Sequence, residues 1–350
     1  MVEDGQIIVN EGIRACKAEL CLLCGKIGTL LYSDLRDRLF GVEGTWSLMR
    51  CSKCDLVWLT PRPDTSDINK LYKGYYTHQF SSIPERGFAK GLRRAIKEKI
   101  LQEELGYSIN LQRDDLIVRL LSKMGLLKEI VVAGVMYLKA EERGKLLDVG
   151  CGNGQFLARM QELGWEVIGV EPDPKAVSIA REHFGLNVFQ GTLEEIKFPD
   201  ESFDAITMNH VIEHVSDPVR LLVECRRILR PGGKLVVATP NIKSLGTILF
   251  GKYCRNLEPP RHLFLFSADS LRACIEQAGL KAWRVWTVTK GARSIWSASC
   301  LLRKKQSPYS NDATQGFGMK VGGIVFWIFE YGMCKLGYMV GEEVVALVTK

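Results

Sequence analysis

The stretch KLLDVGCGNGQFL, residues 145–157, constrains the fold of this 350-residue chain more than any other. Apolar residues lead into Asp148, and Gly150, Gly152 and Gly154 then fall at alternate positions. A strand that runs through a glycine-rich loop into a helix is typical of an α/β sheet that binds a nucleotide-like ligand. The third glycine comes one residue too early for the G-x-G-x-x-G of dinucleotide-binding folds. Because Asp148 would repel a pyrophosphate and attract an ammonium group, the spacing favours a cofactor that carries an amino group.

From residue 145 onward the sequence alternates between short apolar runs and helical stretches, which is typical of an α/β fold with a doubly wound sheet. The strand-like runs are KLLDVG, EVIGVEP, NVFQG, FDAITMNHV and GKLVVATP, followed later by KAWRVWTVTK and EEVVALVTK. The helix in DPVRLLVECRRILRPGG is predicted to stop at its Pro-Gly-Gly. The helix in SADSLRACIEQAG is predicted to begin after an N-cap at Ser267 and to end at Gly279.

Glu171 and the residues after the third predicted strand complete a candidate cofactor pocket. Glu171 follows Gly150 by 21 residues and ends the second predicted strand, where an acid can accept hydrogen bonds from both hydroxyls of an adenosine ribose. Gly191, Thr192 and Leu193 follow the third strand, where an adenine edge would lie. Each feature alone also occurs at an ordinary turn between a strand and a helix, so the prediction rests on their order and spacing.

The segments LLDVGCGNG, GVEPDP, FDAITMNHVIEHVSDP and ILRPGGKLVVATPN resemble the successive motifs of class I S-adenosylmethionine-dependent methyltransferases. The resemblance covers about residues 145–279, and the final EEVVALVTK is similar to the last strand of that family. It implies a Rossmann-like sheet of seven strands with the last strand antiparallel, and S-adenosylmethionine across the strand ends with its methionine part on the glycine loop. The cofactor-binding residues that we assign are Asp148, Gly150, Cys151, Gly152, Gly154, Glu171, Pro172, Thr192, Leu193 and Asn209.

Three of the five histidines fall where an acceptor should bind. Methyl transfer from a sulfonium is an in-line displacement, and a hydroxyl acceptor also needs a base to remove its proton. His210 and His214 directly follow the fourth predicted strand, and His262 lies in the connection after the fifth, where this family usually builds its acceptor site. We predict these three as the catalytic residues. The alternative for His214 and the neighbouring Glu213 is that they only orient the loop.

A narrower resemblance is to the ubiquinone-biosynthesis O-methyltransferases, whose corresponding loop reads acid-x-x-Glu-His and can hold a divalent metal. This chain keeps Glu213 and His214 but has His210 in place of the acid. The departure argues against a catalytic metal.

Two CxxC pairs predict a zinc ribbon over residues 1–60. The pairs are Cys21 with Cys24 and Cys51 with Cys54, separated by 26 residues. Four thiolates would fill a tetrahedral shell and leave no open position, so the zinc would be structural. The alternative is four free thiols on two unrelated turns. The eleven cysteines are otherwise scattered, which suits a reducing compartment, and the N-terminus has no apolar signal segment, so we expect a cytoplasmic protein.

Two further regions flank the predicted elements. Residues 61–143 are expected to form a helical connecting region, in which FAKGLRRAIKEKILQEEL carries an apolar stripe beside basic residues. Residues 144–350 form the predicted methyltransferase domain, with an apolar helical insertion at about 291–341. The insertion places Val321, Ile324, Val325, Ile328 and Phe329 on one helical face. This face either packs on the sheet or receives a lipid-linked acceptor and rests peripherally on the inner face of a membrane.

The sequence thus predicts a methyltransferase that acts on a hydroxyl of a sugar or glycan intermediate, including a lipid-linked one. Methyltransferases of bacterial glycan and sugar pathways are similar in their N-terminal zinc module and in the segment PRHLFLFS. The alternatives are O-methylation of a polyprenyl quinone or phenolic lipid, RNA methylation, and cofactor binding without turnover. The net charge of +7 permits an anionic partner. The ribbon lacks interleaved basic and aromatic residues, which argues against nucleic acid.

Overall fold

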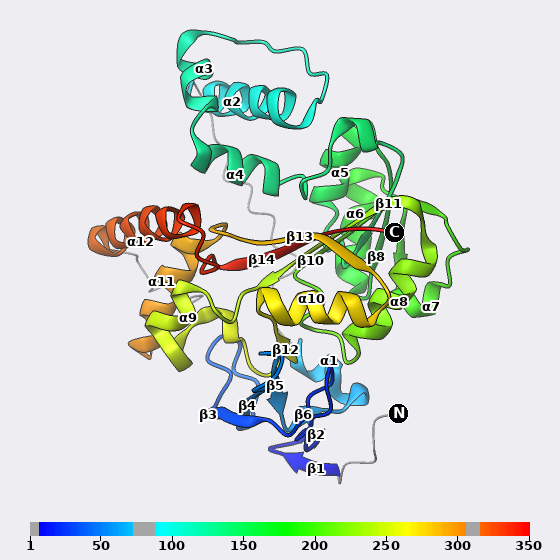
Figure 1. The fold of residues 1–350 in the computed structure, drawn as a ribbon, viewed down its shortest axis with the longest axis vertical. Helices are drawn as coiled ribbons and strands as arrows, with labels where there is room; N and C mark the ends of the chain where they lie inside the picture. The colour runs from blue at the N-terminus through cyan, green and yellow to red at the C-terminus, as the bar shows by residue number, and fades with distance from the viewer. Residues whose placement is uncertain (1–6, 73–87, 306–315) are drawn as a thin grey trace. The chain divides into compact units, whose positions relative to one another are not determined.

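The computed structural model describes residues 7–72, 88–305 and 316–350, which form two compact units (Figure 1). Parts of three predicted regions, namely residues 1–6, 73–87 and 306–315, lie outside the described residues. The first unit takes in residues 7–72, 209–223, 237–305 and 316–347, and the second takes in residues 88–208, 224–236 and 348–350.

A seven-stranded sheet forms the α/β part of the chain, in the order β13-β14-β11-β10-β7-β8-β9. The strands are β7 (Lys145–Val149), β8 (Glu166–Glu171), β9 (Val188–Gln190), β10 (Phe203–Asn209), β11 (Leu229–Pro240), β13 (Lys281–Val288) and β14 (Glu343–Thr349). β7 pairs in parallel with β8 and β10, and β8 pairs in parallel with β9. The chain order reverses at β7, the kind of switch point at which open α/β sheets bind ligands.

The last strand, β14, runs antiparallel to β11. The amide of Gly232, near the start of β11, donates to the carbonyl of Lys350, just beyond the end of β14. The amide of Asn241, just beyond the end of β11, donates to the carbonyl of Glu342, just before β14. The predicted seven-stranded Rossmann-like sheet with an antiparallel last strand is therefore confirmed.

The helices that follow the strands are α5 (Gln155–Glu162), α6 (Pro174–Phe184), α7 (Leu193–Ile196), α8 (Pro218–Ile228) and α10 (Ala268–Gln277). The predicted N-cap of α10 is confirmed, because the Ser267 hydroxyl accepts from the Ser270 amide at 3.2 Å. The predicted stop of α8 is wrong. α8 ends at Ile228 and the Pro-Gly-Gly at 231–233 belongs to β11, where Gly232 and Gly233 both exchange hydrogen bonds with Lys350.

The second unit also contains a helical layer made of α2 (Phe88–Leu105), α3 (Leu116–Ser122), α4 (Gly125–Ala133) and the short η2 (Ala140–Glu142). The predicted apolar stripe of α2 is buried, and Ala95, Ile96 and Ile100 pack with Val118 of α3. The Asp115 carboxylate caps α3 by accepting from the Val118 amide at 3.1 Å.

The N-terminal module of the first unit consists of two small sheets. One contains β1 (Ile7–Asn10), β2 (Ile13–Cys16) and β6 (Arg62–Pro63). The other has the order β12-β5-β4-β3, with β3 (Thr29–Leu35), β4 (Trp46–Arg50), β5 (Val57–Thr60) and β12 (Phe264–Leu265). The chain then forms η1 (Thr65–Asp67) and α1 (Ile68–Leu71). β12 pairs antiparallel with β5, Phe264 opposite Trp58, so the module takes an edge strand from a segment far along the chain.

The first unit also contains α9 (Leu245–Phe250), η3 (Gly251–Tyr253), η4 (Arg255–Leu257), α11 (Ala292–Arg303) and α12 (Phe317–Lys335). Trp296 of α11 joins α9 to α12, because its ring centroid lies 5.4 Å from Phe250 and 5.1 Å from Phe326. α12 turns Gly323, Phe326 and Glu330 inward. Among the described residues, no helix is long and apolar enough to cross a membrane.

Candidate functional site

The glycine loop follows β7 in a conformation that favours glycine. Gly150, Gly152 and Gly154 all have positive φ, at 70°, 54° and 82°. A Cβ on Gly154 would lie 2.6 Å from Leu186 Cδ1 and 2.9 Å from Ala180 Cβ, so the packing of this turn also requires glycine. A Cβ on Gly152 would meet no described atom within 4 Å. The loop is therefore open at Gly152, where a ligand could approach the backbone.

Glu171 at the end of β8 fastens this loop. One carboxylate oxygen accepts from the Gly152 amide at 2.9 Å, and the other accepts from the Asp173 amide at 2.9 Å. Each carboxylate oxygen has a second lone pair, so the predicted contact with two ribose hydroxyls stays compatible with these bonds. The sequence did not indicate the bond to the Gly152 amide.

Asp148 is a buried carboxyl group below the loop. Its Oδ1 accepts from the Thr207 hydroxyl at 2.7 Å. Burial, together with the charge of Glu171, raises the pKa of Asp148 to about 7, against the lowering effect of Thr207. A cation bound beside it would favour the charged form, which is the electrostatic setting that the predicted ammonium contact requires.

The other predicted cofactor residues have different surroundings. Cys151 is buried with its Sγ next to Gly169 and 3.8 Å from the Gly152 carbonyl oxygen. Leu193 is buried at the start of α7, and Thr192 caps that helix with Glu195. Pro172 is exposed directly after β8. Asn209 belongs to the first unit and accepts from Lys290 Nζ at 3.5 Å, whereas the other assigned residues lie in the second unit.

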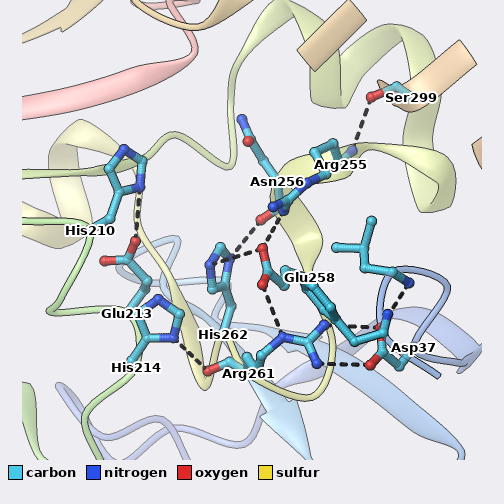
Figure 2. Close-up of polar contacts among 12 residues, drawn as sticks. Asp37, His210, Glu213, His214, Arg255, Asn256, Glu258, Arg261, His262 and Ser299 are labelled. Carbon is cyan, nitrogen blue, oxygen red and sulfur yellow. Dashed lines mark hydrogen bonds and ion pairs between the residues drawn. The ribbon is translucent and has the colours of Figure 1, made fainter. Parts of the chain in front are cut away.

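His210 lies in the first unit and forms ion pairs with two acids. Its Nδ1 lies 3.2 Å from Glu213 Oε1 (Figure 2), and its Nε2 lies 3.0 Å from Glu343 Oε1. Burial lowers the pKa of His210, but the charges of Glu343 and Glu213 outweigh it and raise the pKa to about 10. His210 therefore carries a positive charge at neutral pH, a form suited to neutralising acids rather than to removing a proton.

Glu213 and His214 lie side by side on the loop after β10. Glu213 is fully buried, and its Oε2 accepts from the Thr239 hydroxyl at 2.8 Å. His214 Nδ1 donates to the Arg261 carbonyl at 3.1 Å and lies 3.2 Å from the Tyr72 hydroxyl. Both residues are thus held by neighbours, which is what the orienting alternative expects.

His262 is buried, and its hydrogen bonds define its tautomer. Its Nδ1 donates to the Asn256 carbonyl at 2.8 Å, so the lone pair of the neutral ring lies on Nε2. Burial and the neighbouring His214, whose ring centroid lies 4.8 Å away, lower the pKa of His262 to about 4. Figure 2 shows its ring between Glu213 and His214 on one side and Glu258 on the other. His262 thus has the neutral form that a general base needs.

These histidines line a cavity of about 510 Å³ in the first unit. Its apolar walls come from Pro240 and from Ile295, Ala298 and Leu301 of α11. Eight of its lining side chains are ionisable, namely His210, His214, Arg255, Glu258, His262, Lys290, Glu342 and Glu343. The cavity therefore suits a small polar molecule with several hydrogen-bonding groups.

The segment that carries His262 is held by a network of buried charges. Arg261 Nε donates to Glu258 Oε1 at 2.9 Å, and Arg255 pairs with Glu258 Oε2. Burial raises the pKa of Glu258, but Arg255, His262 and Arg261 outweigh it and hold the pKa well below its usual range. Asp37 of the N-terminal module forms the far end of this network, through Arg261 (Figure 2).

One set of side chains in this network has the donor types for a divalent metal. Glu213, His214 and His262 each offer a ligand atom, and these atoms lie within 4.8 Å of one another. Both histidines donate their Nδ1 proton to a backbone carbonyl, as metal-binding histidines usually do. Two histidines and one carboxylate form a recurrent metal-binding set. The sequence comparison of His210 with an acid did not indicate that His262 lies close enough to Glu213 and His214 to offer a third ligand atom.

The four predicted zinc ligands come together at the tips of two similar turns. Cys21 Sγ lies 3.5 Å from Cys54 Sγ, and Cys24 Sγ lies 3.3 Å from Cys51 Sγ. A tetrahedral zinc with Zn–S bonds of about 2.3 Å has its sulfurs about 3.8 Å apart, so the cluster fits the ion. The carbonyl of the first cysteine in each pair accepts from the amide four residues on, at Gly25 and Asp55.

Sequence reasoning missed several residues of the cavity. Glu342 directly precedes β14 and Glu343 is its first residue, and the two acids of EEVVALVTK were a readable signal because strands of this kind are otherwise apolar. Glu258 is buried beside two arginines, and only the mixed charges of RNLEPPRH indicated it. Lys290 lies 3.7 Å from Glu343 and had no signal in the sequence.

Comparisons with known proteins show similarity to methyltransferases over part of the chain. Residues 124–285 match a family described as "Methyltransferase domain". A ubiquinone biosynthesis O-methyltransferase of Cereibacter sphaeroides is 38% identical over 102 residues, which cover 28% of this chain and 41% of that protein. A probable S-adenosylmethionine-dependent methyltransferase of Mycolicibacterium smegmatis is 32% identical over 148 residues, 42% of this chain and 56% of that one. A solved methyltransferase from Archaeoglobus fulgidus is 19% identical, with a TM-score of 0.41 over 59% of this chain and 86% of that one.

Proposed function

We propose that this chain, which carries a class I S-adenosylmethionine-dependent methyltransferase domain, transfers a methyl group to a hydroxyl of a sugar or glycan acceptor. The matched segment spans about two fifths of the length of the ubiquinone-pathway relatives. The activity proposed for the whole chain therefore rests on the chain's own residues.

The polar cavity around His262 carries the proposal. Its ionisable side chains include Glu258 and Glu342, and Glu342 accepts from Asn256 Nδ2 at 2.8 Å. A polyol can form hydrogen bonds with the polar atoms that face the cavity, whereas an apolar ring would remove water from these atoms without replacing it, at a cost of about 1–3 kcal/mol for each atom left unsatisfied. This difference favours a sugar over a polyprenyl quinone.

His262 is the proposed general base. Its Nε2 would take the proton of the acceptor hydroxyl while the oxygen forms a bond to the methyl carbon and the sulfur–carbon bond breaks, releasing S-adenosylhomocysteine. The His214 ring packs edge-to-face against the His262 ring, and the Asn256 carbonyl fixes the tautomer of His262. Removal of such a base typically lowers the rate about 10²- to 10⁴-fold.

The cofactor would bind to the second unit. Its methionine part would lie on the open loop at Gly152, its ammonium group near Asp148, and its ribose hydroxyls on Glu171. These positions follow from the open space over Gly152 and from the two buried carboxyl groups, which favour a cation and hydroxyl donors. A neutral sheet edge without these acids would offer no such preference.

We also propose that the four cysteines bind one structural zinc. The short distances between their sulfurs support this, and the four thiolates leave no ligand position for substrate. Metal analysis of purified protein is expected to give about one zinc per chain, and Cys51→Ser is expected to lose it. Cys16→Ser, which changes a cysteine outside the cluster, is the control and is expected to keep the zinc.

A second candidate is O-methylation of a polyprenyl quinone or another phenolic lipid. It is favoured by the similarity to ubiquinone biosynthesis O-methyltransferases and by the donor set of Glu213, His214 and His262. In that case these residues would hold a divalent ion, which would lower the pKa of a bound hydroxyl. A chelator that removes this ion would then abolish activity. If His262 acts as the base instead, activity would persist after chelation, provided that the structural zinc is retained.

The test is a titration of the protein with S-adenosylmethionine, followed by a methyl-transfer assay on nucleotide sugars, lipid-linked glycans and polyprenyl quinols. We expect saturable binding that Glu171→Ala weakens, and turnover with an acceptor of the sugar classes. Turnover with quinols alone would replace the first candidate by the second. Absence of S-adenosylmethionine binding by folded, zinc-loaded protein would refute both.

A further inference from the structure

One face of α12 is apolar and exposed along the helix. We call the α12 face the set Val321, Ile324, Val325, Ile328 and Phe329, whose side chains are 40–60% exposed. Their spacing places them on one stripe of the helix. The opposite stripe packs inward on α11, so the face that the sequence singled out is the outer one. Single exposed apolar residues are ordinary, but a contiguous row of five marks an interaction surface.

Neighbouring elements carry further exposed apolar side chains. Ile248 and Leu249 of α9 are more than half exposed, and α9 packs against α11, which in turn packs against α12 (Figure 1). Phe317 and Leu336, near the two ends of α12, are also strongly exposed. Exposed apolar side chains therefore lie on two helices that both pack against α11.

In the described residues of α9, η3, η4, α11 and α12, every exposed charged side chain is basic. The segments 244–257, 291–305 and 316–341 contain exposed basic side chains and a single acid, Glu330, which is fully buried. The exposed basic residues of these segments are Lys252, Arg293, Arg303, Lys304, Lys305, Lys320 and Lys335. Lys320 and Lys335 flank the two ends of the α12 face. An apolar helix face with cations beside it and without exposed acids is the composition of helices that lie in a membrane interface.

We propose that the α12 face and these basic residues dock the protein onto the surface of an anionic lipid bilayer, with α12 lying in the plane of the interface. The apolar side chains would enter the boundary between headgroups and acyl chains, and the cations would contact lipid phosphates. A second copy of the chain is the other occupant for an apolar face. It would bring the same cations against one another, so charge complementarity selects the anionic lipid.

The experiment is co-sedimentation of the full chain with vesicles, without cofactor or acceptor, so that it is independent of the proposed methyl transfer. Vesicles of phosphatidylglycerol and phosphatidylcholine in equal amounts are compared with pure phosphatidylcholine. We expect binding to the anionic vesicles that falls at least ten-fold in 0.5 M salt, and at least ten-fold weaker binding to neutral vesicles.

Two double substitutions separate the apolar contribution from unfolding. Ile328→Ser with Phe329→Ser is expected to weaken binding at least ten-fold with an unchanged Tm. The matched control is Val9→Ser with Leu30→Ser, which removes two apolar side chains that are more exposed, on β1 and β3. The control is expected to bind as the unaltered protein does.

Two double charge-reversal variants test the contribution of the cations in the same way. Lys320→Glu with Lys335→Glu is expected to weaken binding to anionic vesicles, whereas Lys175→Glu with Lys197→Glu, on exposed positions of the second unit, is not. Failure of the protein to bind anionic vesicles would overturn the proposal, as would equal binding by the Ile328 and Phe329 variant. A dimer in solution that this variant dissociates would assign the face to a second copy and would also overturn it.

Discussion

Asp37 and Arg261, which lie 224 residues apart in the chain, form a two-pronged ion pair in which neither side chain is exposed. Arg261 Nη1 donates to Asp37 Oδ2 at 2.8 Å, and Nη2 donates to Oδ1 at 2.9 Å. Asp37 also accepts from the amides of Leu39 and Val42. Since His262 follows Arg261 directly, the N-terminal module holds the segment that carries the proposed base.

Removing this carboxylate should destabilise the protein strongly. Asp37→Ala leaves the buried Arg261 with Glu258 as its remaining acid, and the free energy of unfolding should fall by about 3 kcal/mol, the lower end of the range for broken buried ion pairs. Urea denaturation measures the difference. The control is Glu11→Ala, which breaks an exposed pair with Arg36 at 3.4 Å and should change stability by less than about 1 kcal/mol. Equal effects of the two substitutions would contradict this account.

The same ion pair predicts a dependence of stability on pH. Burial raises the pKa of Asp37, but the hydrogen bonds and charge of Arg261 outweigh it, so the folded pKa lies below its usual value. In the unfolded chain the pKa of Asp37 is about 3.9, so Asp37 takes up a proton at a higher pH in the unfolded chain than in the folded chain. The stability difference between the unaltered protein and Asp37→Asn should therefore be full at neutral pH and shrink below about pH 4. A difference that grows on acidification would exclude this role.

The glycine loop offers a test that separates folding from cofactor binding. A Cβ meets no described atom within 4 Å at either Gly152 (φ 54°) or Gly185 (φ 65°). Alanine at each position should therefore lower stability by a similar amount, about 1 kcal/mol, because both must adopt a left-handed backbone. Only Gly152→Ala should weaken S-adenosylmethionine binding, by at least ten-fold in a calorimetric titration. Unchanged affinity would place the cofactor elsewhere.

The three histidines of the cavity should differ in their effects on turnover. His262→Gln should lower kcat about 10²- to 10⁴-fold and leave S-adenosylmethionine affinity unchanged, because it removes the proposed base. His210 neutralises the charges of Glu213 and Glu343, so His210→Gln should act mainly by leaving these two acids without a cation. The substitution should raise KM for the acceptor more than it lowers kcat. His183→Gln, on an exposed position of α6, is the control. A His262 variant with normal kcat would rule out this base.

The strands and the turn of the glycine loop were predictable because their signals are local. Alternating apolar runs and turn residues locate β7 to β11, and Ser267 places the start of α10 through its own side chain. The end of α8 was not predictable, because Gly232 and Gly233 pair with Lys350, which lies more than a hundred residues later. A tripeptide that usually stops a helix is here part of a strand for that reason.

The cavity that we propose for the acceptor was predictable only in its histidines. Glu258, Glu342 and Lys290 reach it from separate parts of the chain, and a buried charge is recognisable from sequence only with its partner known. Asp37 and Arg261 illustrate this, since each looks like an ordinary surface residue when read alone. The outer orientation of the α12 face depends in turn on how closely Gly322 and Gly323 let that helix approach Trp296.

The two-residue strand β12 links the order of synthesis to the completion of the N-terminal module. β3, β4 and β5 leave the ribosome first, and about 200 residues must be made before Phe264 and Leu265 can pair with Val57 and Trp58. At typical translation rates this interval lasts about 10 to 40 s. During this interval β5 has an unpaired strand edge, and Asp37 lacks its ion pair with Arg261. A nascent chain of this protein can therefore mispair at the open edge of β5. This edge is covered only when the segment that carries His262 and β12 has been translated.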